Sequence, residues 1–74
     1  MTTDELEFSV FCIECVADEL GIDGKEVYRL MTTCPGLNVL DDYVVAYYDT
    51  LHTQGEEYIV RELLEVMRKR GVAV

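Results

Sequence analysis

The chain has 74 residues, 50% of them hydrophobic, and its 15 acidic and 6 basic residues give a formal net charge of −9 at pH 7. A chain of this length has no room for a second hydrophobic core, so we expect a single domain over residues 1–74. The negative charge argues against nucleic acid and against anionic membranes as partners, because both present phosphates that attract cations.

The first predicted element is a helix that starts at Thr2 or Thr3 and ends at Gly21. Thr2 and Glu5 have the spacing of a capping box, and a glycine is common just after a helix C-terminus. Apolar side chains cover most of its circumference: a stripe of Leu6, Val10, Ile13, Ala17 and Leu20, with Phe8, Phe11, Cys12, Cys15 and Val16 around it. Only a narrow acidic strip interrupts them, so we expect this helix to be central and buried on several sides.

The second predicted helix starts at Asp23 and stops before Pro35-Gly36. Glu26 lies three residues after Asp23, which is again capping-box spacing. Proline cannot continue a helix, and it disfavours helical geometry at the residue before it. The expected buried side consists of Val27, Leu30, Met31 and Cys34, with Tyr28 beside them.

The segment from residue 37 to residue 51 permits two interpretations. Residues 44–48, Val-Val-Ala-Tyr-Tyr, have a composition that is typical of strands. Against a strand, Asn38 and Asp41 resemble a helix start, and apolar residues recur at helical spacing at positions 40, 43, 44, 47 and 51. We favour a helix, with a short strand as the alternative.

The last predicted helix has a start signal, an apolar side and a stop signal. Thr53 and Glu56 have capping-box spacing at its start, and Gly71 stands where a C-terminal glycine belongs. Arg61 and Glu65 are spaced for an ion pair on the charged side. Together the elements predict an all-α protein, a compact single-domain bundle of about four helices with the first helix at its centre.

Three cysteines bear on compartment and on metal binding. Their odd number fits a reducing compartment, and we see neither an apolar leader nor an 18-residue apolar run, so we expect a cytoplasmic protein. Cys12 and Cys15 have C-x-x-C spacing, and Cys34 with His52 could complete a Cys3His zinc site. The pair lies inside a predicted helix among apolar residues, so we interpret both cysteines as core residues and expect no metal and no cofactor.

Four segments of the chain resemble an uncharacterised family of small bacterial domains, catalogued as a domain of unknown function. They are residues 11–14, 24–30, 42–43 and 51–60, and the last of them reads Leu-His-Thr-Gln and then Glu-Tyr-Ile-Val. The resemblance covers roughly residues 5–70. Members of that family are short cytoplasmic proteins, often encoded beside or fused to a domain resembling ADP-ribosyltransferases. The resemblance therefore implies an antitoxin-like binding or regulatory accessory, without an established active site.

The turn before the last helix contains His52, the only histidine, together with Thr53 and Gln54. In a structural interpretation Thr53 caps the helix and His52 forms a hydrogen bond with a nearby carbonyl or with a carboxylate such as that of Asp49. In a functional interpretation the three side chains contact a partner. No nucleophile stands beside His52 in the sequence, so we expect that the protein is not an enzyme.

The five tyrosines complete the candidate surface, because tyrosines with one apolar and one wet end are favoured at protein interfaces. Tyr47 and Tyr48 diverge by about 100° on a helix, so at least one of them should be exposed. The candidate partner-binding residues are His52, Thr53, Gln54, Tyr47, Tyr48 and Tyr58. We expect a protein–protein interaction or regulatory accessory module, with a homodimer that covers surplus apolar surface as the alternative.

Overall fold

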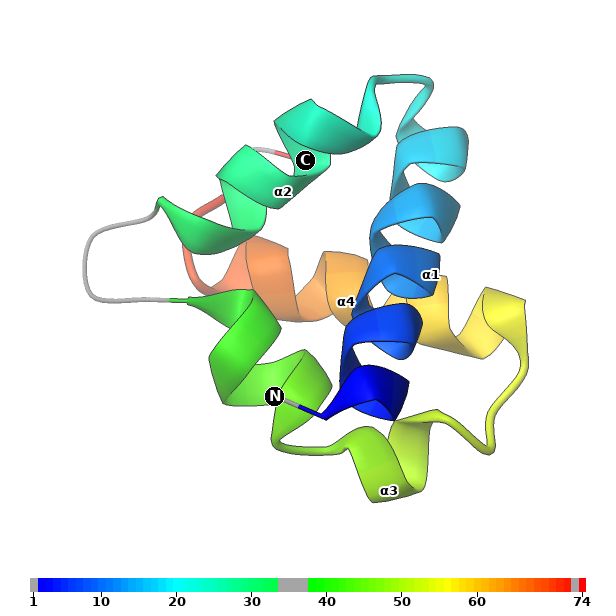
Figure 1. The fold of residues 1–74 in the computed structure, drawn as a ribbon. Coiled ribbons are helices and arrows are strands. Elements are labelled where there is room, and N and C mark those ends of the chain that lie inside the picture. The colour runs from blue at the N-terminus through cyan, green and yellow to red at the C-terminus, as the bar shows by residue number, and fades with distance from the viewer. Residues whose placement is uncertain (1, 34–37, 73) are drawn as a thin grey trace.

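The computed structural model describes residues 2–33, 38–72 and 74, which form five helical elements around one core (Figure 1). The elements are α1 (Thr3–Leu20), α2 (Gly24–Thr32), the π-helix η1 (Leu40–Val45), α3 (Tyr48–Leu51) and α4 (Glu56–Lys69). The prediction of an all-α bundle is confirmed. Within the described ranges, every helix is too short or too polar to cross a lipid bilayer.

The first helix is central, as predicted, because α2, η1 and α4 all pack against α1 (Figure 1). Its predicted capping box is present: the Glu5 N–H donates to the Thr2 hydroxyl at 3.1 Å, and the Thr2 N–H donates to the Glu5 carboxylate at 2.8 Å. Gly21 ends the helix in the left-handed region, at φ 69°, and the Ile22 N–H donates back to the Ala17 carbonyl.

The prediction that α1 is buried on several sides is wrong for the first half of the helix. The buried residues of α1 are Ser9, Cys12, Cys15, Val16 and Ala17. By contrast, Leu6, Val10 and Phe11 are 54%, 47% and 44% exposed. The reason is the direction of α2, which begins beside the last turns of α1 and then runs away from that helix (Figure 1). Nothing among the described residues covers the outer side of the first turns.

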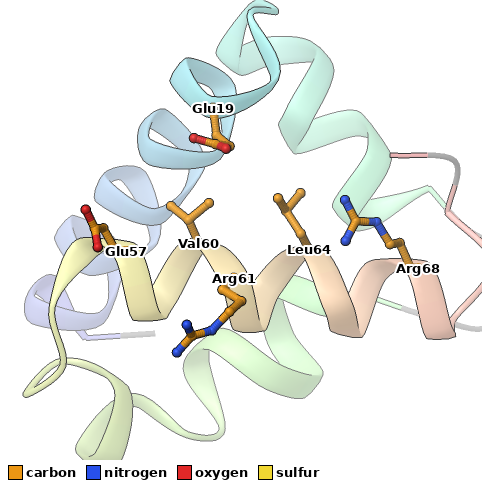
Figure 2. Close-up of a pocket in the computed structure, with 6 residues that line it drawn as sticks. All are labelled: Glu19, Glu57, Val60, Arg61, Leu64 and Arg68. Carbon is orange, nitrogen blue, oxygen red and sulfur yellow. The ribbon is translucent and has the colours of Figure 1, made fainter.

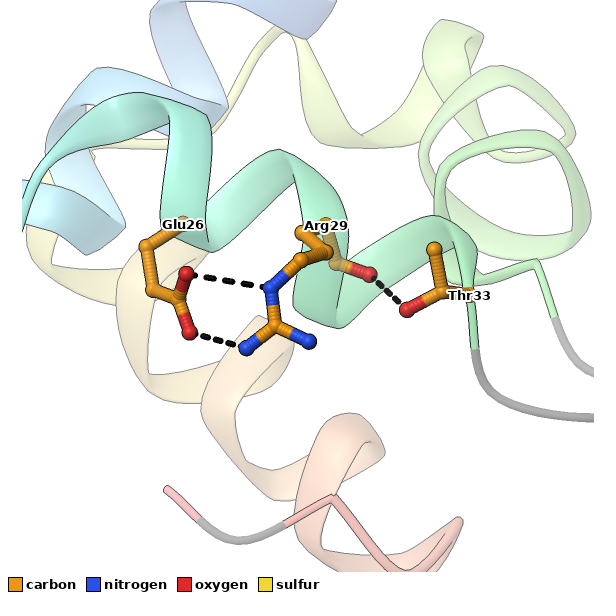
Figure 3. Close-up of polar contacts among 3 residues, drawn as sticks. All are labelled: Glu26, Arg29 and Thr33. Carbon is orange, nitrogen blue, oxygen red and sulfur yellow. Dashed lines mark hydrogen bonds and ion pairs between the residues drawn. The ribbon is translucent and has the colours of Figure 1, made fainter.

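The second helix begins as predicted but without a capping box. The Asp23 carboxylate accepts a hydrogen bond from the Lys25 N–H at 2.9 Å. The Glu26 carboxylate instead pairs with Arg29 one turn later, with Arg29 Nε 3.0 Å from one oxygen (Figure 3). The Arg29 guanidinium thereby lowers the pKa of Glu26. Val27 and Met31 are buried as predicted, whereas Cys34 and the predicted stop at Pro35-Gly36 lie outside the described residues.

The ambiguous segment is helical, so the alternative of a short strand is wrong, but the helix is broken. The Asn38 side chain accepts from the Asp41 N–H at 3.1 Å, which confirms the predicted start. The wider π-helical turns of η1 follow, and the chain leaves helical geometry at Tyr47 before α3 begins. About four predicted helices therefore become five helical elements.

The start of α4 differs from its prediction. Gly55 precedes the helix and no side chain caps it, so the predicted capping box of Thr53 and Glu56 is wrong. The Thr53 hydroxyl donates backward to the Thr50 carbonyl at 2.8 Å. Because α4 begins at Glu56 and Gly55 holds the N-cap position, Thr53 lies two residues too early to cap the helix. The predicted end is confirmed: Gly71 is left-handed at φ 88°, and the Val72 N–H donates to the Met67 carbonyl.

The charged side of α4 also pairs differently from the prediction. Glu65 forms its ion pair with Lys69, at 3.2 Å, and not with Arg61. The Arg61 guanidinium lies over the Tyr58 ring instead, 5.7 Å from its centroid. Glu65 lies one helical turn from Arg61 and one helical turn from Lys69, so the sequence spacing was compatible with either ion pair.

A matched pair of threonine variants tests the caps. We expect Thr2→Ala to lower the free energy of unfolding by about 1 kcal/mol, because it removes the hydroxyl that caps α1. Thr53→Ala should change it by less than about 0.5 kcal/mol, because the Thr53 hydroxyl is exposed and does not cap α4. Urea denaturation followed by circular dichroism measures both. An equal loss in the two variants would contradict this assignment of the caps.

Candidate functional site

The six candidate residues lie on α3, on α4 and in the turns that precede and follow α3. His52, Thr53 and Gln54 are exposed in that turn, and Gln54 Nε2 lies 3.5 Å from the Thr53 hydroxyl. Tyr47 is 55% exposed and Tyr48 is half-buried, which confirms that at least one of this pair is exposed. Tyr58, in the first turn of α4, is also exposed.

His52 is held by Tyr48, the residue one helical turn before it. The His52 Nδ1 lies 2.6 Å from the Tyr48 carbonyl oxygen, and because a carbonyl can only accept, this nitrogen donates. The two rings also pack, with centroids 4.5 Å apart. The structural interpretation of His52, a hydrogen bond to a nearby carbonyl, is therefore confirmed. The same contact holds the imidazole in one orientation at the surface.

The ring of Tyr48 continues an aromatic row onto α1. Phe8 packs on Tyr48 with ring centroids 5.4 Å apart, and Phe8 and Phe11 stack at 6.3 Å. We call the four side chains Phe11, Phe8, Tyr48 and His52 the aromatic row. The two ends of the row, Phe11 and His52, are exposed, and the two middle rings are half-buried. The row therefore joins α1 to the turn that the sequence singled out.

Acidic residues lie near Tyr48, in the middle of the aromatic row. The pKa of Tyr48 is raised by partial burial of its ring and by four nearby acidic side chains, which are Asp4, Asp49, Glu5 and Glu7. A neutral phenol is favoured there because a second negative charge would be repelled. The row is thus an apolar surface with an acidic border.

The other two candidate tyrosines, Tyr47 and Tyr58, lie outside the aromatic row. Tyr43 and Tyr47 pack with ring centroids 5.2 Å apart. Burial raises the pKa of Tyr43, and the charges of Glu62 and Tyr58 on α4 raise it further. Tyr47 packs on Tyr43 and Tyr58 lies under the Arg61 guanidinium, whereas His52 and Tyr48 belong to the aromatic row. The contacts thus divide the predicted surface into two parts.

Cys12 and Cys15 lie on the side of α1 that faces the core. Burial raises the pKa of Cys12 to about 12, and burial together with the Glu56 carboxylate raises the pKa of Cys15 to about 12 as well. Thiols of this kind stay protonated at neutral pH and are poor nucleophiles and poor metal ligands. The described residues contain no group of three or more side chains that could hold a metal ion, and Cys34 lies outside them.

A groove of about 400 Å³ lies between α4 and the end of α1 (Figure 2). Val60 and Leu64 point from α4 toward the side where Glu19 of α1 lies, and the rim consists of Glu19, Glu57, Arg61 and Arg68. The rim carries two charges of each sign. Every buried side-chain nitrogen or oxygen in the described ranges already has a hydrogen-bond partner, so nothing in the groove selects one ligand chemistry.

Sequence reasoning missed Phe8 and Phe11 as surface residues. It placed both in the core because α1 is apolar over most of its girth. A signal was present: Phe11 lies four residues after Glu7 and three before Glu14, so it shares a helix side with exposed acids. The proximity of Phe8 to Tyr48, forty positions later, had no signal in the sequence.

A comparison with family models finds a match that covers most of the chain. Residues 7–70 match the family described as "Protein of unknown function (DUF3791)". The match agrees with the resemblance to an uncharacterised family over most of the chain. No curated protein and no solved structure matches the chain.

Proposed function

The chain belongs to the DUF3791 family, and from this premise we propose that it is a protein-interaction module that acts as a regulatory accessory. Its partner would be an effector enzyme encoded beside it, with a domain like those of ADP-ribosyltransferases, as the family resemblance implies. The module would then act in the manner of an antitoxin. The proposal assigns no reaction, metal or cofactor to the chain.

The aromatic row carries this proposal. Interface residues that contribute most to binding are often aromatic, because large rigid rings bury much area at little cost in side-chain entropy. Here four rings adjoin at the surface, with Phe11 and His52 exposed at the ends. A lone exposed aromatic residue is ordinary, but a connected row of them is a surface suited to contact with another protein.

The side chains of the aromatic row are also held in place before a partner binds. Tyr48 packs between Phe8 and His52, and the His52 imidazole is held by the Tyr48 carbonyl at 2.6 Å. Side chains that are already fixed lose less conformational entropy when a partner binds. The acidic residues beside Tyr48 favour a partner with basic residues around its own apolar contact.

The test starts with capture of a partner from the native cell lysate on the tagged protein, with identification by mass spectrometry. The companion is then purified, and its affinity is measured by calorimetry against wild type and Phe11→Ala/His52→Ala. We expect the double variant to weaken binding at least about 30-fold, as the loss of about 2 kcal/mol at an interface centre does. The control is Tyr28→Ala, which removes an exposed aromatic ring on α2 outside the aromatic row and should bind like wild type.

Two results would contradict the proposal. If the aromatic-row variant binds the companion as tightly as wild type, the row is not the interface. If the chain is recovered alone at twice its own mass, the homodimer becomes the better explanation, and the exposed Leu6 and Val10 supply an apolar surface that a dimer would cover. Circular dichroism of each variant confirms that the fold is retained.

A further inference from the structure

The first half of α1 leaves an apolar stripe uncovered. The stripe runs along one side of the helix through Leu6, Val10, Ile13, Ala17 and Leu20. In its second half Ala17 is buried, and Ile13 and Leu20 are packed against the core. In its first half Leu6 and Val10 are 54% and 47% exposed. We call Leu6 and Val10 the uncovered stripe.

The covered half shows what kind of element this side of α1 accepts. There α2 packs against α1, with Val27 and Met31 of α2 fully buried in the shared core. The approach is close: a Cβ at Gly24 would lie 3.6 Å from the Ile13 side chain. The same stripe thus already receives one helix, and Leu6 and Val10 continue it at the i, i+4 spacing that a second helix can use.

The charge on α1 defines the partner more closely. The helix has six acidic residues and no basic residue, and they are Asp4, Glu5, Glu7, Glu14, Asp18 and Glu19. Glu7 and Glu14 are exposed and lie one helical turn from Val10, so they border the uncovered stripe. Symmetric pairing with the stripe of a second copy would bring two such acidic helices together, which is unfavourable. A helix with Lys or Arg beside its apolar face would complement them.

We propose that the uncovered stripe receives a basic amphipathic helix of the partner protein, which packs on Leu6 and Val10 and pairs with Glu7 and Glu14. This inference rests on the proposed function, because it supplies the chemistry of the partner. It adds a second contact beside the aromatic row, on the other side of the Glu7 and Glu14 strip.

The test uses a synthetic 14-residue helical peptide of leucine and lysine, with leucine at helical spacing on one face. The peptide is titrated into the isotope-labelled full chain and followed by NMR. We expect saturable shift changes concentrated in the first turns of α1. Leu6→Ser/Val10→Ser should weaken binding at least tenfold, and Glu7→Gln/Glu14→Gln should weaken it and reduce its salt dependence. Since these side chains are exposed, both variants should keep the wild-type circular dichroism spectrum.

Two control peptides separate this contact from general attraction to an acidic protein. One has the same composition in an order without an apolar face, and the other has glutamate in place of lysine. Equal binding of either control, or shift changes centred on α2 or α4, would overturn the inference. So would a wild-type dimer in sedimentation equilibrium that Leu6→Ser/Val10→Ser converts to a monomer, because the occupant would then be a second copy.

Different results would contradict the interface at the aromatic row and the helix contact at the uncovered stripe. If the leucine–lysine peptide does not bind, but Phe11→Ala/His52→Ala still loses the captured partner, the interaction module stands and the helix contact falls. If the peptide binds at the uncovered stripe, but the aromatic-row variant keeps the captured partner, the aromatic row loses its assigned role and the helix contact stands.

Discussion

Replacement of Leu63 by alanine is expected to lower the free energy of unfolding by about 2–5 kcal/mol. Leu63 lies on α4, has no exposed surface and belongs to the core that also contains Val16 and Met31. Its truncation removes apolar contacts and leaves a space that the neighbouring helices can only partly fill. A domain of this size has a total stability of about 4–11 kcal/mol, so the variant should lose a large share of it.

The matched control is the same substitution at Leu6. Leu6 is mostly exposed, so Leu6→Ala should change the free energy of unfolding by less than about 0.5 kcal/mol. Urea denaturation followed by circular dichroism compares the two variants with wild type. Similar losses at both positions would mean that Leu6 is buried in solution, either by this chain or by a second copy. A concentration series would distinguish the two cases, since only a dimer gains stability with protein concentration.

The second large expected effect is a loss of stability at alkaline pH. In the folded chain the pKa of Cys12 and that of Cys15 are both raised from 9.0 to about 12, chiefly because burial disfavours the thiolate. Between these values the unfolded chain has lost the two protons and the folded chain still holds them. Stability is therefore fully present below pH 9 and falls as the pH rises toward 12, by about 1.4 kcal/mol per pH unit for each thiol.

This effect is measured as the free energy of unfolding in urea at pH 7 and at pH 10. We expect wild type to lose about 3 kcal/mol through the two thiols over this interval. Cys12→Ala/Cys15→Ala is less stable at pH 7 but should show a smaller pH-dependent loss, and what remains includes Tyr43 and Tyr48, whose pKa values are also raised. An unchanged pH dependence in the double variant would show that both thiols titrate normally in the folded protein.

The helices and several of their ends were predictable because they depend on neighbours within a few positions. The Thr2 cap, the Asn38 start and the glycines at 21 and 71 all occur as predicted. Each is an interaction between a backbone group and a residue no more than one turn away. The signal for such a feature lies entirely in the local sequence.

Local reasoning failed where one side chain had two partners within reach. Glu26 pairs with Arg29 rather than with the start of α2, and Thr53 bonds to the Thr50 carbonyl rather than to the start of α4. The sequence spacing suits both choices in each case. For Thr53 the outcome depends on where the turn after α3 ends: Gly55, and not Thr53, precedes the first residue of α4, which the local spacing does not determine.

The sequence by itself therefore determined that the chain is helical, where most helices begin and end, and that α1 is central. It also identified His52 and Tyr48 as candidate residues. Only the tertiary structure decided which apolar residues are exposed, because burial requires a covering element and α2 runs away from α1 and leaves Leu6 and Val10 exposed (Figure 1). The contact of Phe8 with Tyr48 was decided in the same way, since it joins residues far apart in the chain whose proximity follows from packing.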